Sequence, residues 1–136
     1  MAFLSVYIVT LDEEKRLPAT LQALQGLADE IVVVDAGSKD RTQEIIRSFG
    51  AKFYFRPWDN YASQKKYAES LCSGDWLMNI DADEEISPEL AVELRKSIED
   101  GRFDVFKLRI AAVFPGLPRP NPWVKCNNVV RLYHRG

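Results

Sequence analysis

Residues 76–85, which read WLMNIDADEE, join an apolar run to a group of carboxylates. The run has the composition of a buried strand, and Asp81 and Asp83 follow it, separated by one alanine. Carboxylates that follow a strand lie at the carboxyl edge of a sheet, where open α/β folds bind their ligands. Such a pair supplies the hard oxygen ligands that suit Mg²⁺ or Mn²⁺ carrying a diphosphate. Taken alone, the same pattern also fits a solvated acidic turn before a helix.

Apolar runs alternate with helical patterns around this stretch, which is typical of βαβ units and predicts a mostly parallel sheet flanked by helices. Strands are expected at residues 3–10, 30–34, 52–55, 75–80, 105–110 and 129–133. Helices are expected from Leu17, after Asp40, at 61–71 and from Pro88. Asp40 is expected to cap its helix in a capping box with Gln43, and Ser87 to cap the helix that Pro88 opens.

The composition is that of one ordinary globular domain, expected over residues 1–136. Hydrophobic residues make up 46% of the chain and charged residues 28%, and 136 residues can bury one core but hardly two. The formal net charge of −2 argues against a nucleic-acid-binding surface. Cys72 and Cys126 lack the spacing of a zinc site or a disulfide framework, and the apolar run at 3–9 is too short to span a membrane. We therefore expect a cytoplasmic protein that associates at most peripherally with the inner face of a membrane.

Polar residues follow three of the expected strands. Thr10-Leu11-Asp12-Glu13 comes after the first, Asp35-Ala36-Gly37-Ser38 after the second, and Asp81-Ala82-Asp83 after the fourth. Because the carboxyl ends of parallel strands meet at one edge of a sheet, these side chains are expected to converge on one ligand.

Taken together, these segments resemble the family-two inverting nucleotide-sugar glycosyltransferases with the GT-A fold, in particular the lipopolysaccharide-core branch. The matching pieces are residues 8–14, 29–42, 56–58, 64–65, 68 and 74–84. The resemblance implies a Rossmann-like GT-A fold and metal-dependent, inverting transfer of a sugar from a nucleotide-diphosphate donor, with UDP-sugars favoured. The implied acceptor is a saccharide or a lipid-linked molecule in cell-envelope biosynthesis of the lipopolysaccharide type.

The resemblance also implies which residues bind the nucleoside. Asp35 is implied to contact the base or the ribose, although Ala36 stands where the family often has a second acid. Thr10 and Asp12 are implied to line the nucleoside pocket. Asp12 replaces the usual Asn, and an ionised Asp only accepts hydrogen bonds, so a contact made through an amide N–H would be lost. Turn capping by Asp35 and a charged helix start at Asp12 are the alternatives.

The other implied contacts concern the phosphates and the metal. Gln64 and Lys65, at the start of the third expected helix, are implied to face the nucleotide, where a cation would supply positive charge beside the diphosphate. Asp83 is implied to hold the divalent cation, with Asp81 nearer the ribose or a water on the metal. For Lys65 the alternative is a solvated helix face.

Inverting transfer also needs a general base that takes the proton of the acceptor hydroxyl. In the resembled family this carboxylate follows the metal motif on the acceptor side, and no residue here is assigned to it. The chain ends at Gly136 without a closing helix, so we expect the base beyond Gly136 and regard residues 1–136 as the N-terminal part of a longer, here C-terminally incomplete, enzyme. His134, the single histidine, is expected to be satisfied or exposed rather than catalytic.

Two other functions fit parts of the pattern. A nucleotidyltransferase also uses paired metal-binding carboxylates on an α/β sheet, but residues 10–16 contain no glycine and so lack its Gly-rich phosphate loop. A non-catalytic nucleotide-sugar binding module would share the same binding residues, and only an activity measurement separates it from a transferase.

Overall fold

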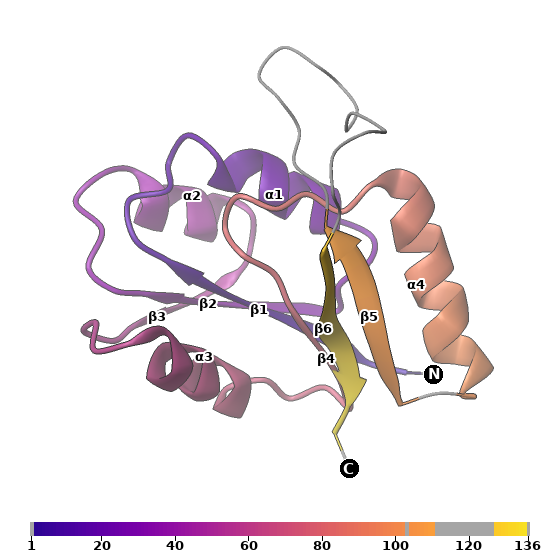
Figure 1. Cartoon of the computed structure of the whole chain (residues 1–136). Coiled ribbons are helices and arrows are strands. Elements are labelled where there is room, and N and C mark those ends of the chain that lie inside the picture. The colour runs from indigo at the N-terminus through magenta and orange to yellow at the C-terminus, as the bar shows by residue number, and fades with distance from the viewer. Residues whose placement is uncertain (1, 103, 111–126, 136) are drawn as a thin grey trace.

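The computed structural model describes residues 2–102, 104–110 and 127–135, which form one α/β sheet between helices (Figure 1). The sheet has six strands in the order β3-β2-β1-β4-β6-β5. The strands are β1 (Leu4–Thr10), β2 (Glu30–Asp35), β3 (Lys52–Phe55), β4 (Trp76–Asn79), β5 (Val105–Ile110) and β6 (Asn127–His134). The helices are α1 (Leu17–Leu24), α2 (Thr42–Ser48), α3 (Tyr61–Ser70) and α4 (Pro88–Asp100). The expected fold class is confirmed, and Cys126 lies outside the described residues.

The order of the strands creates a switch point beside β1. Strands β1, β2, β3 and β4 pair in parallel, whereas β6 pairs antiparallel with both β4 and β5. The chain builds outward from β1 through β2 to β3, and β4 then returns to the other side of β1. In open α/β sheets the crevice at the carboxyl ends of two such strands is the usual ligand site.

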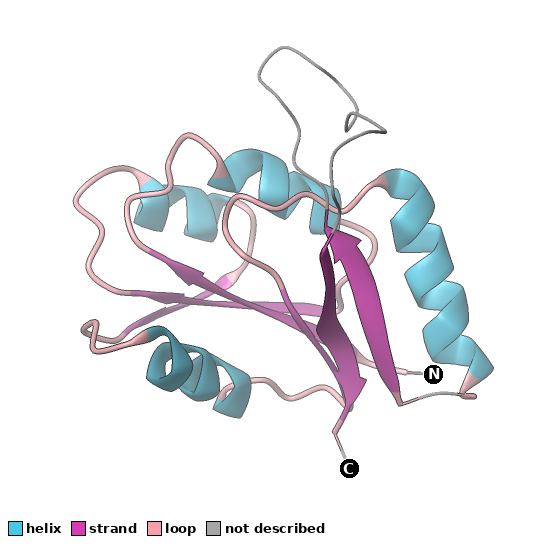
Figure 2. Cartoon of the chain, viewed as in Figure 1, coloured by secondary structure: helices cyan, strands magenta, loops and turns pink. Residues whose placement is uncertain are grey.

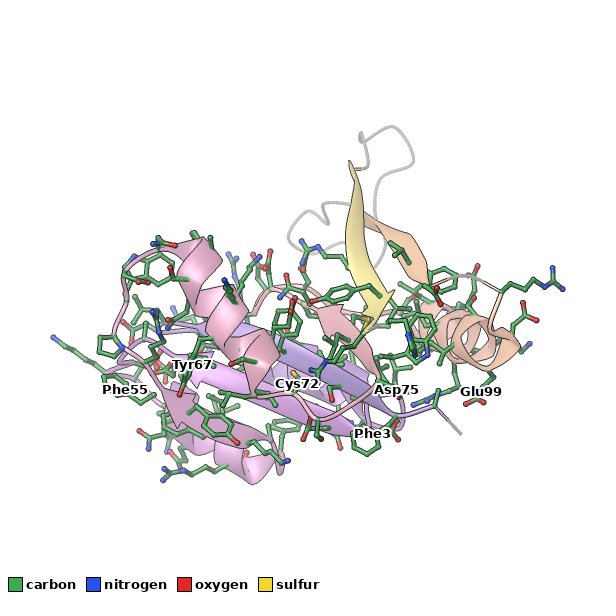
Figure 3. The ribbon with its side chains drawn as sticks, turned by 90° about the horizontal axis from the view of Figure 1, so that it is seen from below. Phe3, Phe55, Tyr67, Cys72, Asp75 and Glu99 are labelled. Carbon is green, nitrogen blue, oxygen red and sulfur yellow. The ribbon has the colours of Figure 1, made fainter. Side chains whose placement is uncertain are left out.

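Alternate residues of each strand pack against opposite helical layers. In β1, Leu4, Val6 and Ile8 belong to the core cluster formed with α1, α2 and α4, whereas Tyr7 belongs to the cluster under α3. Figure 2 shows α1 and α2 on one side of the sheet and α3 on the other. Seen from the α3 side, Cys72 lies just after that helix, against the sheet, where it is buried (Figure 3).

Of the two expected helix caps, one is confirmed and one is wrong. The Ser87 side chain accepts a hydrogen bond from the Leu90 N–H at 3.1 Å, as a capping serine does. Helix α2 instead has Arg41 at its N-cap, without a side-chain bond, so the capping box at Asp40 is not formed. The Asp40 carboxylate accepts from the N–H groups of Thr42 at 2.9 Å and Glu14 at 3.2 Å. Asp40 thus bonds the first residue of α2 through one carboxylate oxygen and the loop after β1 through the other, without the reciprocal bond from Gln43 that a capping box requires.

A buried carboxylate ties together the amino-terminal edge of the sheet, opposite the switch point. The Glu30 side chain accepts hydrogen bonds from Lys52 Nζ at 2.6 Å, Ser5 Oγ at 2.7 Å and the Ser73 N–H at 2.8 Å. Burial alone would raise the pKa of Glu30, but the bonds from Lys52, Ser73 and Ser5 prevail and lower this pKa to about 2. Glu30 is therefore an ionised structural group far from the candidate site.

Candidate functional site

The first part of the candidate site is the Asp35 turn at the carboxyl ends of β1 and β2. The Asp35 carboxylate is 2% exposed. It accepts hydrogen bonds from Thr10 Oγ1 at 2.7 Å, from the N–H groups of Gly37 at 3.0 Å and Ser38 at 2.7 Å, and from Ser38 Oγ. The structure thus brings Thr10 and Asp35 together and satisfies the carboxylate within its own turn. Contact between Asp35 and a nucleoside stays a prediction.

Asp12 links the loop after β1 to the loop after β2. Its backbone has φ 51°, a left-handed conformation that is uncommon outside glycine but accessible to Asp. Its N–H donates to Ser38 Oγ at 2.8 Å, and its Oδ1 accepts from the Lys39 N–H at 2.8 Å. One residue further, the Glu13 N–H donates to Thr42 Oγ1 at 2.8 Å. These reciprocal bonds hold the two loops as one preorganised wall of the switch point.

The second part of the candidate site is the acidic loop after β4. Asp81 lies between two cations: its Oδ1 is 3.4 Å from Lys65 Nζ and its Oδ2 is 3.4 Å from Arg131 Nη2. The Asp83 carboxylate is 3.3 Å from Arg16 Nη1, at the start of α1. The side chains of Asp81 and Asp83 are 45% and 49% exposed, so both are accessible to a ligand from solvent.

Arg131 and Glu84 complete this loop, and the sequence reasoning missed both of them. Glu84 accepts from Arg131 through both carboxylate oxygens, Oε1 at 3.0 Å and Oε2 at 3.2 Å, in a bidentate pair. Burial raises the pKa of Glu84, and the Asp81 N–H and the Arg131 charge only partly oppose that shift. The available signal was Arg131 itself, a charged residue inside the apolar run of residues 129–133.

Gln64 and Lys65 are neighbours in sequence but lie in different surroundings. Gln64 is fully buried, and its amide both accepts from Arg56 Nη1 at 2.8 Å and donates to the Arg56 carbonyl at 2.9 Å. It joins the start of α3 to the segment after β3. Lys65 points to Asp81, so the structure brings Lys65 to the acidic loop, whereas the expected contact of Gln64 with a nucleotide stays a prediction.

The two parts of the site lie on either side of the switch point, at the same edge of the sheet. Arg16, which follows the first wall at the start of α1, lies 3.3 Å from the Asp83 carboxylate, and the Thr20 hydroxyl donates to the Ala82 carbonyl at 2.7 Å. Thr10, Asp12 and Asp35 therefore lie on the β2 side of the switch point, and Asp81 and Asp83 on the β4 side. This arrangement can hold an elongated, negatively charged ligand along the carboxyl edge.

The acidic loop fits a divalent cation that a substrate helps to hold. Among the residues that the structure describes, no group of three or more His, Cys, Asp or Glu side chains could enclose a metal ion. The acidic loop instead offers two carboxylates that are accessible from solvent, those of Asp81 and Asp83. Mg²⁺ characteristically keeps several waters and is bound by one or two carboxylates together with substrate phosphates. The donor set is thus suited to a metal–diphosphate ligand rather than to a closed structural metal site.

Comparison with known proteins places these features in one family. The family described as glycosyl transferase family 2 matches residues 5–126. A protein of Rickettsia typhi named as an uncharacterized glycosyltransferase is 35% identical over 138 residues, covering 99% of this chain and 47% of that protein. The lipopolysaccharide core biosynthesis glycosyltransferase LpsC of Rhizobium meliloti is 40% identical over 92 residues, covering 64% of this chain and 34% of LpsC. The chain thus spans about half the length of the rickettsial relative.

Solved structures share the fold at lower identity. Staphylococcus aureus TarS in complex with UDP aligns with a TM-score of 0.68 at 22% identity, covering 88% of this chain and 38% of that chain. Glucosyl-3-phosphoglycerate synthase from Mycobacterium tuberculosis, in complex with Mn²⁺, UDP and glucosyl-3-phosphoglycerate, aligns with a TM-score of 0.61 at 23% identity, covering 78% and 43%. No helix among the described residues is long and apolar enough to cross a membrane.

Proposed function

This chain belongs to glycosyl transferase family 2, and from that membership and the geometry of its site we propose that it binds a nucleotide-sugar donor, with UDP-sugars favoured, together with Mg²⁺ or Mn²⁺. The observation that carries the proposal is the position of Asp81 between Lys65 and Arg131, beside Asp83, at the switch point of the sheet. Carboxylates there suit a cation, and the ammonium and guanidinium groups suit phosphates.

The charges of the acidic loop match those of a leaving diphosphate. Glycosyl transfer builds negative charge on the β-phosphate as the bond from the sugar C1 to oxygen breaks. A divalent cation bound there would supply Lewis-acid stabilisation of that charge. In the proposed assignment Asp83 and Asp81 hold the cation, and Lys65 contributes positive charge beside the phosphates. Thr10, Asp12 and Asp35 form the wall that receives the nucleoside, and Gln64 keeps the segment before Lys65 in place.

The acceptor side of the reaction is the second half of the proposal. In inverting transfer the acceptor hydroxyl attacks the sugar C1 opposite the diphosphate and loses its proton to a general base. No residue of the described site is assigned as that base, and we propose that it lies outside residues 1–136, which would form the donor-binding domain of a longer enzyme. The likeness to LpsC, a lipopolysaccharide core glycosyltransferase, supports a saccharide or lipid-linked acceptor of the cell envelope.

A cation-dependent binding screen tests the donor proposal. Isothermal titration calorimetry of the chain with UDP, GDP, ADP and CMP, each with and without Mg²⁺, reports base preference, metal and diphosphate together. We expect UDP to bind most tightly and only when the cation is present. Equal binding with and without the cation, or no binding of any nucleoside diphosphate, would contradict the proposal.

A further inference from the structure

We propose that Arg131 is a positioning residue for the donor site, holding the Asp81 carboxylate in the orientation that receives the metal–diphosphate ligand. Arg131 acts through Asp81 and Glu84, without itself contacting the ligand. The inference rests on the proposed donor-binding function, and Arg131 lies outside the short segments, up to residue 84, on which the resemblance to the family is based.

The contacts of Arg131 span the whole acidic loop. Nη1 donates to the Asn79 carbonyl at 3.3 Å, where β4 ends, and to Glu84 Oε1 at 3.0 Å. Nη2 donates to Glu84 Oε2 at 3.2 Å and to Asp81 Oδ2 at 3.4 Å. One planar guanidinium therefore fixes the end of the strand and both carboxylates, which a single ammonium cannot do in this geometry.

The loop is also closed on itself through the same glutamate. The Asp81 N–H donates to Glu84 Oε1 at 2.8 Å, and the Glu84 N–H donates to the Asp81 carbonyl at 3.0 Å. Glu84 Oε1 thus accepts from both Arg131 and the Asp81 backbone. As a result, the position of the guanidinium sets the backbone of Asp81 as well as its side chain.

Arg131 is held more firmly than the other cation on Asp81. Its side chain is 10% exposed, against 34% for Lys65. The next residue in β6, Leu132, is fully buried, and Tyr133 OH lies 2.6 Å from Tyr7 OH of β1. Arg131 therefore projects from a strand anchored in both cores, whereas Lys65 is a half-buried side chain on the surface of α3 that forms an ion pair with Asp81.

Whether loss of Arg131 strengthens or weakens metal binding distinguishes a positioning role from a purely electrostatic one. A positive side chain beside a cation site repels the cation, so on charge alone the loss of Arg131 would tighten metal binding. If Arg131 instead orients Asp81, its loss weakens metal binding, as partners behind metal ligands do by about 10–100-fold when they are removed. The structure favours the second outcome because the guanidinium contacts Asp81 through Oδ2 and leaves Oδ1 to the more exposed Lys65.

The test measures Mn²⁺ affinity by electron paramagnetic resonance, UDP affinity by calorimetry with Mn²⁺ present, and the melting temperature. Arg131→Gln alone leaves Glu84 buried without a counter-charge and can unfold the chain. The double variant Arg131→Gln/Glu84→Gln removes that unpaired charge, while the amide carbonyl introduced at position 84 can still accept from the Asp81 N–H. Because loss of the Glu84 carboxylate by itself weakens the attraction for a cation, the double variant is compared with Glu84→Gln, from which it differs only at Arg131. Arg131→Lys keeps the positive charge but lacks the planar guanidinium that donates to two carboxylates at once. The matched control is Arg135→Gln, which removes the same charge next to the end of β6. In the unaltered chain Arg135 donates to the Cys72 carbonyl at 2.8 Å, away from the acidic loop.

We expect the double variant to melt close to the unaltered chain yet to bind Mn²⁺ and UDP at least about tenfold more weakly than Glu84→Gln does. Arg131→Lys should not restore binding, and Arg135→Gln should bind normally. Mn²⁺ binding by the double variant that equals or exceeds that of Glu84→Gln, or normal binding by Arg131→Lys, would overturn the role of Arg131. If the unaltered chain binds neither Mn²⁺ nor UDP, the proposed function itself fails, and the inference fails with it.

Discussion

Thr10 and Asp35 are register partners at the carboxyl ends of β1 and β2, and the Thr10 hydroxyl donates to the Asp35 carboxylate at 2.7 Å. The same carboxylate accepts both N–H groups of the following turn, from Gly37 and Ser38. One buried group therefore joins two strands to the loop of the proposed nucleoside wall. The local turn role and the proposed nucleoside role of Asp35 are consequently carried by one side chain.

Asp35→Ala should lower both stability and nucleotide affinity. The substitution leaves buried donors of Thr10 and of the turn without an acceptor, which costs about 1–3 kcal/mol of unfolding free energy. Urea denaturation measures this loss, and calorimetry should show weaker UDP binding to the fraction that stays folded. Thr10→Val, which removes one donor and keeps the carboxylate, is the comparison and should cost less. UDP affinity unchanged in folded Asp35→Ala would contradict the nucleoside role.

Asp83→Asn should weaken cation-dependent binding of UDP with little effect on stability. Its ion pair with Arg16 joins two half-exposed or exposed side chains and contributes little to folding. A lost carboxylate–metal contact should cost more than about 1.4 kcal/mol, or tenfold in affinity. Calorimetry with Mn²⁺ present checks this outcome. Asp100→Asn at the end of α4 removes the same charge away from the site and should leave the affinity unchanged.

Stability should fall in acid as Glu30 takes up a proton. Its pKa drops from 4.5 to about 2 on folding, so its stabilising effect is complete above pH 4.5 and is lost as the pH falls toward 2. The free-energy difference is on the order of 3 kcal/mol. Urea denaturation midpoints measured stepwise from about pH 6 downward give the dependence of stability on pH. Glu30→Gln should be less stable than the unaltered chain near neutral pH, and its unfolding free energy should fall less between pH 4.5 and 2. An identical pH dependence in both proteins would rule out this origin.

Residues 1–136 should bind the donor without transferring its sugar at a useful rate. No general base is assigned among the described site residues, and general-base assistance is worth about 10²–10⁴ in rate. The measurement compares UDP release and acceptor glycosylation for this chain and for a protein that carries a further segment comparable in length to the rest of its relatives. Efficient acceptor glycosylation by residues 1–136 alone would show that the base lies within them, with Glu84, Glu85, Asp104 and His134 as the first candidates.

Local sequence patterns determined the elements and the polar strand ends of this protein. The β-branched run before Asp35, the apolar run before Asp81 and the Ser87-Pro88 helix start were sufficient because periodicity, turn residues and capping act over a few neighbouring residues. The parallel arrangement followed from the strand–helix alternation. Together with the resemblance to family two, these patterns predicted the fold class and the edge of the sheet that carries the site.

Only the tertiary structure decided which side chains meet at that edge. Arg131 reaches Asp81 because β6 runs antiparallel beside β4, a pairing between segments about fifty residues apart that no local period encodes. For the same reason the local pattern did not predict that Asp40 would accept from the Glu14 N–H, 26 residues earlier in the chain, in addition to the Thr42 N–H. Hydrogen-bond partners are chosen among all groups that folding brings within reach, so the sequence alone specifies the chemistry available and the folded chain specifies how it is paired.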